Sequence, residues 1–439
     1  MKERIDAVIV AGAGLAGCEA AWQLAKRGIP VRLVEMKPEK FTPAHHSPDF
    51  AELVCSNSLG SDALTNASGL MKEELRRLDS LVIRMADKNR APAGQALAVD
   101  RERFSRDITE TLRNMALIEI VPTELTEIPE DRYILLATGP LTSAALSESI
   151  RNLTAGDYLY FYDASAPIVT FESIDPEFSY LQSRYEQGDG AYINCPLTKE
   201  EYQAFYGELI RAERAPKKYF EKEKLFDACM PVEKIADTGE RTLVFGPLKP
   251  KGLVNPRTGK EDYAVVQLRR DDLEGKLYNM VGFQTNLKWG EQKRVFSMIP
   301  ALRNAEFVRY GVMHRNTFID SSRLLNATLR LKNRDKVYFA GQLTAGEGYV
   351  AAVATGALAG INMARQILGQ SPFILDDRSA IGALVRYITT ENENLQPMGP
   401  NFGVMRTPDP PIRNKKEKYK KMAETALQYL DEKLKEEPS

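Results

Sequence analysis

The N-terminal residues alternate between patterns typical of buried strands and of a helix. An apolar run from Ile5 to Val10 leads into a glycine-rich segment, Gly12 to Gly17, after which apolar residues recur at helical spacing. Gly28 is predicted to end this helix, and a second apolar run, Val31 to Val34, ends at Glu35. Strand, helix and strand in this order predict a complete βαβ unit.

The glycine-rich segment has the spacing G-x-G-x-x-G at the start of that helix. Glycines there permit a tight turn and let the backbone approach a pyrophosphate, while the helix N-terminus offers unpaired N–H groups to it. An acidic residue at the end of the second strand can accept a hydrogen bond from a ribose hydroxyl. The pattern predicts a dinucleotide site formed by Gly12, Ala13, Gly14, Leu15, Ala16, Gly17 and Glu35.

Two later segments bear on which dinucleotide is bound. Tyr133 to Gly139 is predicted as a buried strand that closes on Thr-Gly, and Val337 to Gln342 as a strand that closes on a glycine. The second precedes a long uncharged segment, 348–364, whose small residues are typical of a buried helix and not of a membrane span. Both strands resemble the later elements of FAD proteins with two dinucleotide-binding halves. This favours FAD over NAD and adds Gly341 and Gln342 to the candidate site.

The middle of the chain differs from its two ends in composition and in hydrophobic pattern. Aromatic residues and charged helical segments are followed by two strand-like runs, Thr242 to Phe245 and Tyr263 to Leu268. We therefore predict an α/β protein with a Rossmann-like, two-dinucleotide-binding FAD fold and an inserted α/β domain. The expected boundaries are 1–156 and 303–439 for the two parts of the FAD-binding domain, and 157–302 for the inserted substrate domain.

Length and composition are those of an ordinary globular protein. The 439 residues suffice for two or three domains, and 43% hydrophobic with 27% charged residues excludes collagen-like and disordered classes. The net charge is −1, so no global positive field draws the protein onto nucleic acid or an anionic membrane. A polyanionic partner would have to meet a local basic patch.

One such patch lies at the start of a predicted C-terminal amphipathic helix. Apolar residues recur there at helical spacing from Met422 to Leu434, behind a run of basic residues. The composition leaves two interpretations open, a solvated helix face or phosphate contacts to RNA. The candidate RNA-binding residues are Lys415, Lys416, Lys418, Lys420 and Lys421.

The four cysteines form no C-x-x-C pair, which fits neither a disulfide framework nor a zinc knuckle and predicts a reducing, cytoplasmic setting. Cys18 is predicted to pack in the core beside alanines, and Cys195 is also interpreted as structural. Cys55 and Cys229 stand in polar contexts where an inert buried thiol is uncommon. We expect no metal site, because His45 and His46 have too few neighbouring ligands.

Unbroken blocks along nearly the whole chain resemble the bacterial methylenetetrahydrofolate- and FAD-dependent tRNA (uracil-5-)-methyltransferases. Among them are GAGLAG at 12–17, TPAHH at 42–46, ELVCSNSL at 52–59, DYLYFYDA at 157–164, YINCP at 192–196, CMP at 229–231, VGFQTNLKWGEQ at 281–292, YGVMHRNTFI at 310–319 and EGYV at 347–350. The resemblance departs from the family at Gly60, at Gln95 and at Ala351-Ala352.

The resemblance implies a reaction and a set of roles. Methylenetetrahydrofolate would give its one-carbon unit to reduced FAD, which passes it to C5 of a uridine in the tRNA T-loop, with NADPH or NADH supplying electrons. By family position, Cys229 is the nucleophile at uracil C6, and Cys55 lies over the flavin as general base or shield. His314 would stack on the folate pterin, and Glu347 would join the cofactor site.

The uracil chemistry agrees with these roles, because C5 is not nucleophilic until a thiolate adds at C6, and a second group must then remove the C5 proton. Two alternatives stay open at this point. A related protein methylates ribosomal RNA, and a plain FAD-dependent oxidoreductase, such as a disulfide reductase, would share the fold. The latter needs two neighbouring cysteines, whereas Cys55 and Cys229 lie far apart in the chain.

Overall fold

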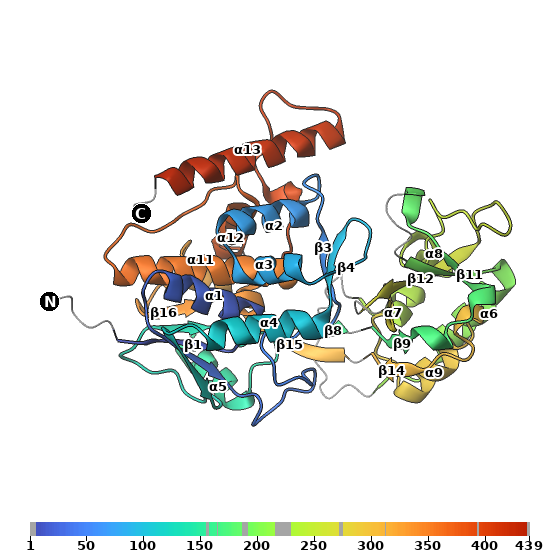
Figure 1. Cartoon of the computed structure of the whole chain (residues 1–439), viewed down its shortest axis with the longest axis horizontal. Coiled ribbons are helices and arrows are strands. Elements are labelled where there is room, and N and C mark those ends of the chain that lie inside the picture. The colour runs from blue at the N-terminus through green and yellow to red at the C-terminus, as the bar shows by residue number, and fades with distance from the viewer. Residues whose placement is uncertain are drawn as a thin grey trace.

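Two lobes make up the molecule in this computed structural model (Figure 1). The structure describes residues 6–154, 158–164, 166–186, 192–215, 230–271, 275–311, 313–392 and 395–436. The larger lobe is built from the first and last parts of the chain, blue to teal and orange to red in Figure 1, and the smaller lobe from the green and yellow middle part.

A five-stranded parallel sheet lies at the centre of the larger lobe. Its strand order is β16-β7-β1-β2-β6. The strands are β1 Val8–Ala11, β2 Val31–Glu35, β6 Ile118–Pro122, β7 Ile134–Leu136 and β16 Val337–Phe339. Helix α1, Leu15–Lys26, follows β1, and Gly28 takes a positive φ of 77° directly after the helix. The predicted βαβ unit and the two later strands are therefore confirmed.

The long uncharged segment is helix α11, Tyr349–Ile367, and nearly all of it is buried. It packs closely on α1, since a Cβ atom added to Gly356 would lie 2.4 Å from the carbonyl oxygen of Ala16. At Gly360 an added Cβ would lie 2.8 Å from the carbonyl oxygen of Ala20. Small residues thus permit the backbones to touch. The predicted burial of this helix is confirmed. Within the described ranges, no helix is both long and apolar enough to span a membrane.

Helices α2, α3, α4 and α12 pack against this pair of helices, and the larger lobe has further elements besides. The helices are α2 Ala67–Arg77, α3 Leu81–Lys88, α4 Arg101–Arg113, α5 Ala144–Leu153, α10 Ser321–Leu324, α12 Ala380–Thr389 and α13 Lys415–Lys435, with 3-10 turns η6 Gly341–Thr344 and η7 Phe402–Val404. A small antiparallel sheet, in the order β3-β5-β4, consists of β3 Ser58–Ser61, β4 Arg90–Ala91 and β5 Ala96–Val99.

The smaller lobe contains a six-stranded antiparallel sheet in the order β10-β11-β12-β13-β9-β14. Its strands are β9 Ile168–Thr170, β10 Tyr180–Leu181, β11 Tyr192–Leu197, β12 Ala264–Arg270, β13 Leu277–Met280 and β14 Phe307–Arg309. The helices beside it are α6 Lys199–Arg211, α7 Val232–Asp237, α8 Thr242–Phe245 and α9 Trp289–Phe296, with 3-10 turns η1 Phe171–Ser173, η2 Pro176–Phe178, η3 Arg184–Glu186 and η5 Pro300–Leu302.

Each lobe has a hydrophobic core of its own. One core draws its residues from 8–153 and 318–434, and the other from 166–307. The antiparallel pair of β8, Tyr158–Ala164, and β15, Met313–Ile319, carries the chain between them. The predicted boundaries at 156/157 and 302/303 stay a prediction, and we propose moving the second beyond β14, because that strand pairs with β9.

One predicted strand is wrong. The run from Thr242 to Phe245 forms the short helix α8, in which Leu243 is buried and Phe245 is exposed. A four-residue apolar run has no periodicity that separates helix from strand. The other strand predicted in this part of the chain, Tyr263 to Leu268, is confirmed as β12.

A buried carboxylate ties the C-terminal part of the larger lobe to α2. Glu74 accepts hydrogen bonds from the N–H groups of Ala380 at 2.8 Å and Ile381 at 2.9 Å, and from Ser379 Oγ at 3.0 Å. These are the otherwise unpaired donors at the start of α12. Burial raises the pKa of Glu74 to about 7, although the hydrogen bonds lower it.

We predict that Glu74→Gln changes the pH dependence of stability. A raised carboxyl pKa means that the folded protein binds more protons than the unfolded chain between its ordinary value and about 7, so the free energy of unfolding falls as the pH rises through that window. The fall should be smaller in the variant, which has no proton to lose there. Urea unfolding at pH 5 and pH 8 measures it, and an unchanged fall would contradict the prediction. Burial also raises the pKa of Glu19 and Glu233, and both contribute in the same direction in the two proteins.

Candidate functional site

A cleft opens at the carboxyl ends of the parallel strands, where ligands bind in open α/β sheets. It encloses about 1170 Å³ of unfilled space, including its opening to solvent. Of the predicted cofactor residues, eight line it: Gly12, Ala13, Gly14, Leu15, Ala16, Glu35, Gly341 and Gln342. The sequence prediction therefore assembles into one site.

The other two predicted residues, Gly17 and Glu347, do not line the cleft but contact residues that do. An added Cβ at Gly17 would lie 1.8 Å from the carbonyl oxygen of Gly12, so this glycine serves the close approach of helix and loop. Glu347 is buried, and its two carboxylate oxygens each accept a hydrogen bond from Gln342 Nε2 at 3.0 Å. Glu347 therefore orients a residue that lines the cleft.

Gly14 tests whether a dinucleotide fits the cleft. Its φ of −75° suits any residue, and an added Cβ would meet no protein atom within 4 Å. The absence of a side chain is thus not explained by packing, but it leaves the N-terminus of α1 open to the cleft, and no side chain caps that helix end. This is the arrangement that accepts a pyrophosphate.

Glu35 has a second role that the sequence did not predict. Its Oε2 accepts a hydrogen bond from the N–H of Ala13 at 2.7 Å, and its Oε1 accepts one from the N–H of Lys37 at 3.0 Å. The carboxylate thereby ties the end of β2 to the glycine-rich loop. It retains lone pairs for a ribose hydroxyl, and that contact stays a prediction.

Sequence reasoning missed further residues of the cleft. They include Lys37, Thr42, His45, Thr123, Thr138, Gly139 and Tyr349. Thr123 follows β6 and Thr138 follows β7, so the rule that ligands lie beyond strand carboxyl ends would have found both. His45 comes from the loop after β2, where its Nδ1 lies 2.6 Å from Thr42 Oγ1.

Cys55 lies at the edge of this cleft and is half-buried. The hydroxyl oxygen of Tyr349 accepts hydrogen bonds from the backbone N–H of Cys55 at 2.8 Å and of Ser56 at 3.1 Å. Both Tyr349 and Val54 line the cleft. Burial raises the pKa of Tyr349, so its hydroxyl stays protonated at neutral pH.

Three arginines from both lobes hold the segment around Cys55. Arg101, at the start of α4, donates to the carbonyl oxygen of Leu53 at 2.8 Å. Arg309, at the end of β14, donates to the carbonyl oxygen of Val54. Arg269 on β12 donates to the side-chain oxygens of Ser56 and Asn57, the latter at 3.2 Å.

This arginine cluster carries an excess of positive charge. Among the described residues, one carboxylate is bonded to it, Asp271, which pairs with Arg101 at 2.8 Å. Burial lowers the pKa of both Arg269 and Arg309. Two buried nitrogens of this region, Arg101 Nε and Asn279 Nδ2, have no hydrogen-bond partner in the described part of the chain, and Asn279 lies directly opposite Arg269 in the sheet. The cluster is therefore equipped to meet an acceptor or a negative charge.

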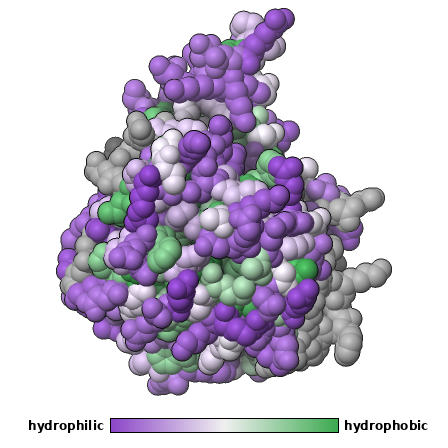
Figure 2. Space-filling model, turned by 90° about the vertical axis from the view of Figure 1, so that its right-hand side faces the viewer, coloured by the Kyte–Doolittle hydropathy of each residue, from purple (hydrophilic) through white to green (hydrophobic). Residues whose placement is uncertain are grey.

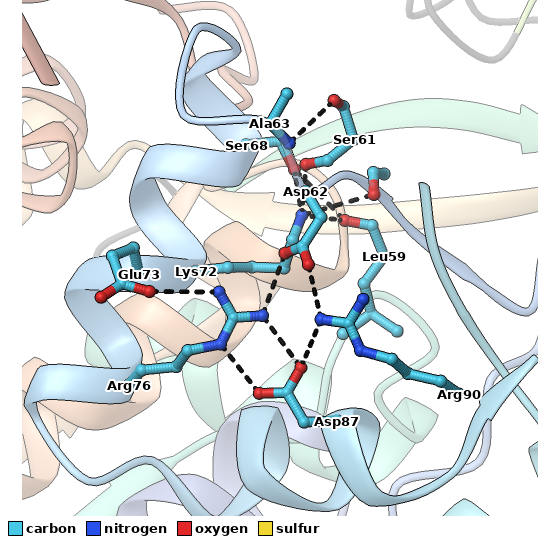
Figure 3. Close-up of polar contacts among 11 residues, drawn as sticks. Leu59, Ser61, Asp62, Ala63, Ser68, Lys72, Glu73, Arg76, Asp87 and Arg90 are labelled. Carbon is cyan, nitrogen blue, oxygen red and sulfur yellow. Dashed lines mark hydrogen bonds and ion pairs between the residues drawn. The ribbon is translucent and has the colours of Figure 1, made fainter. Parts of the chain in front are cut away.

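A buried lysine, Lys72, holds residues 59–61, which follow the Cys55 segment in the chain (Figure 3). Lys72 Nζ donates to the carbonyl oxygens of Leu59 at 2.9 Å and Ser61 at 2.8 Å, and to Ser68 Oγ at 3.0 Å. Burial lowers the pKa of Lys72 to about 8. Gly60 has a positive φ of 78°, which fits a glycine at this departure from the family pattern.

Next to Lys72, Figure 3 shows a ring of two arginines and two aspartates. Arg76 bonds Asp62 and Asp87 at 2.8 to 2.9 Å, and Arg90 bonds the same two carboxylates. The ring joins α2, α3, β4 and the turn after β3. It therefore fixes the framework from which the Cys55 segment extends.

The other predicted catalytic and binding residues divide into two groups. Cys18 and Cys195 are fully buried, one in each core, as predicted, and burial raises the pKa of both thiols. Cys229 lies outside the described residues, and so does the side chain of His314, whose backbone pairs with Asp163.

The predicted RNA-binding lysines begin α13. Lys415, Lys416, Lys420 and Lys421 are exposed, Lys418 is half-buried, and none of the five has an ion-pair partner among the described residues. Figure 2 shows hydrophilic side chains over the upper projection of the molecule, where Figure 1 places the start of this helix.

Comparison with solved structures first identifies the fold class of the protein, which is that of GidA. The solved structure of Aquifex aeolicus GidA in its form II crystal superposes with a TM-score of 0.72 at 16% identity, over 99% of this chain and 74% of that one. The form I crystal gives a TM-score of 0.71 at 17% identity, over 98% and 76%. The predicted α/β, Rossmann-like FAD fold with an inserted domain is thus confirmed.

Sequence comparison defines the family. Residues 7–371 match the family described as Glucose inhibited division protein A. Relatives named methylenetetrahydrofolate--tRNA-(uracil-5-)-methyltransferase TrmFO are 66% identical in Fusobacterium nucleatum, over 98% of this chain and 99% of the relative, and 58% identical in Carboxydothermus hydrogenoformans, over 98% of each. A relative of that name from Bacillus licheniformis is 56% identical, over 96% and 98%. The chain belongs to the TrmFO family.

We predict that Lys72→Met loosens the segment beyond Cys55. Loss of a charged donor leaves buried carbonyl groups unpaired, at a cost of about 1–3 kcal/mol. Amide hydrogen exchange at residues 58–62 should accelerate about tenfold or more. Lys88→Met, at an exposed lysine on the neighbouring helix, is the control and should leave this exchange unchanged. Equal exchange in the two variants would show that Lys72 is not the clamp.

Proposed function

We propose that this protein methylates C5 of a uridine in the T-loop of tRNA, with methylenetetrahydrofolate as carbon donor and FAD as cofactor. The observation that carries the proposal is a cleft at the glycine-rich loop with a half-buried cysteine at its edge. The chain is also 66% identical to a relative named methylenetetrahydrofolate--tRNA-(uracil-5-)-methyltransferase TrmFO. NADPH or NADH is the proposed source of electrons, and the proposed location is the cytoplasm.

The FAD would be held by residues that the cleft already brings together. The backbone from Gly12 to Ala16 would take the pyrophosphate, and Glu35 would take a ribose hydroxyl. Gly341 and Gln342, oriented by Glu347, lie on the α11 side of the cleft. When bound, the flavin supplies the reducing electrons and carries the one-carbon unit from the folate.

The protein's own residues activate the uracil. Cys229 Sγ adds to C6, a carbon–sulfur bond forms, and the ring electrons move toward C5 and O4. After C5 has gained the carbon, Cys55 takes the C5 proton or shields the flavin. Reduction of the added carbon to a methyl group re-forms the C5–C6 double bond, and the C6–S bond breaks with its electron pair returning to Cys229 as a thiolate. The positive charge of Arg101, Arg269 and Arg309 beside Cys55 would stabilise negative charge on the uracil oxygen.

Two further contacts complete the proposal. His314 would stack on the folate pterin. Lys415, Lys416, Lys418, Lys420 and Lys421 would contact tRNA phosphates. Four of them are exposed, Lys418 is half-buried, and none has an ion-pair partner among the described residues, which supports this role.

The function is tested by mass spectrometry of nucleosides. RNA lacking 5-methyluridine is treated with the protein, FAD, NADPH and methylenetetrahydrofolate. We expect 5-methyluridine in tRNA and none in ribosomal RNA. Cys229→Ala should abolish methylation and the covalent RNA adduct, whereas Cys55→Ala should abolish methylation but still permit an adduct. Cys195→Ala is the control, because that thiol is buried in the core. An active Cys229→Ala variant would contradict the mechanism.

The cofactor site is tested at Gly14. A Cβ atom added there meets no protein atom within 4 Å, and a valine side chain would extend from it into the cleft, so Gly14→Val should weaken FAD binding about 100-fold or more and leave the fold intact. Flavin absorbance and circular dichroism measure the two effects. Gly207→Ala on α6, where an added Cβ also meets nothing within 4 Å, should retain its flavin. A yellow Gly14→Val protein would refute the site.

A further inference from the structure

Three aromatic rings form a stacked ladder on the smaller lobe. The rings of Trp289 and Tyr310 have centroids 5.7 Å apart and an interplanar angle of 14°, and those of Tyr310 and Phe307 are 5.6 Å apart at 11°. Trp289 is the first residue of α9, and Phe307 and Tyr310 lie in and just after β14. The three rings are thus nearly parallel and successive.

The ladder ends in an exposed ring. Trp289 is 62% exposed, whereas Tyr310 and Phe307 are half-buried. The chain has one other tryptophan, Trp22, and its surroundings differ. Trp22 donates its indole N–H to the carbonyl oxygen of Asp79 at 2.8 Å, and Lys26 and Arg84 lie over its ring. Among the described residues, Tyr310 is the ring partner of Trp289, so the outer part of that indole faces solvent.

A buried glutamine fixes the ladder in place. Gln292 Nε2 donates to the carbonyl oxygens of Leu287 at 2.7 Å and Gly311 at 2.8 Å, and its Oε1 accepts from the N–H of Gly311 at 2.8 Å. These bonds hold the residue after Tyr310 against the start of α9. The rings are therefore ordered before any ligand arrives, which reduces the entropy lost on stacking.

One residue of the ladder follows an arginine that bonds the segment around Cys55, and an exposed lysine lies on the same helix as Trp289. Arg309, which precedes Tyr310, donates to the carbonyl oxygen of Val54 next to Cys55. Lys293 follows Trp289 by four residues, so both side chains project from the same face of α9. Lys293 is exposed and has no ion-pair partner among the described residues.

We propose that Trp289 stacks against a nucleobase of the RNA substrate, close to the target uridine, and that Lys293 contacts an adjacent phosphate. An exposed aromatic ring beside a cation is the combination by which proteins bind single-stranded RNA. The proposal rests on the proposed function, which supplies RNA as substrate. It adds a subsite outside the cofactor cleft.

The surroundings favour a nucleobase over a protein partner. Lys288, Glu291 and Arg294 flank Trp289 on α9, and each is engaged in a surface ion pair. A protein interface would need a broader apolar patch. A single flat ring on a charged surface matches one base and its phosphate instead.

Tryptophan fluorescence tests the proposal directly. In a Trp22→Phe background of the holoenzyme, Trp289 is the remaining tryptophan. Titration with an RNA stem-loop that reproduces the T-arm should quench its emission in a saturable manner. Trp289→Ala should weaken RNA binding about fivefold or more, and Trp289→Phe should retain most of the affinity. Phe245→Ala, which removes another exposed ring of the same lobe, should leave affinity and flavin content unchanged.

The outcomes separate this proposal from the function on which it rests. If the protein methylates and binds the stem-loop while Trp289 emission is unchanged and Trp289→Ala binds normally, the subsite is wrong and the function stands. Quenching by tetrahydrofolate alone, without quenching by RNA, reassigns the ladder to the folate and overturns the proposal. If the stem-loop neither binds nor is methylated, both fail.

Discussion

Three guanidinium groups hold residues 53–57 between the two lobes, and the geometry of the candidate site depends on this contact. Arg101 comes from the larger lobe, and Arg269 and Arg309 come from the sheet of the smaller lobe. Each bonds a backbone carbonyl or a side chain within two residues of Cys55. The position of Cys55 beside the cleft is therefore fixed by both lobes together, so a shift of one lobe against the other would move the thiol.

Buried charges recur throughout this framework, and two of them, Lys72 and Glu74, are bonded to backbone groups. Lys72 is bonded to the carbonyl oxygens that follow β3, and Glu74 is bonded to the N–H groups at the start of α12. A buried charge is costly unless hydrogen bonds replace the water it has lost. Each such residue consequently ties together segments that lie apart in sequence, and here they surround the Cys55 segment and the helices behind the cleft.

The two proposed RNA contacts are of different physical kinds. The lysines at the start of α13 offer charge on an exposed helix, and a charge interaction of that kind is long-range, sequence-independent and screened by salt. The ladder ending at Trp289 offers a flat surface on the smaller lobe, where contact with a base would be short-range and oriented. A neutral protein can therefore attract RNA locally with the first and position it with the second.

The sequence by itself determined the βαβ unit, the glycine-rich loop, the two later strands and the buried small-residue helix. These depend on periodicity and on glycine positions, which act over a few residues. The strand predicted from the sequence at Thr242 to Phe245 is wrong, because four apolar residues show neither the helical nor the strand periodicity. The arginine cluster was decided by tertiary structure alone: Arg101 lies 48 residues from Leu53, and Arg309 lies 255 residues from Val54. No local sequence pattern predicts a contact between residues so far apart in the chain. The pairing arises only when the packing of two hydrophobic cores brings these segments together.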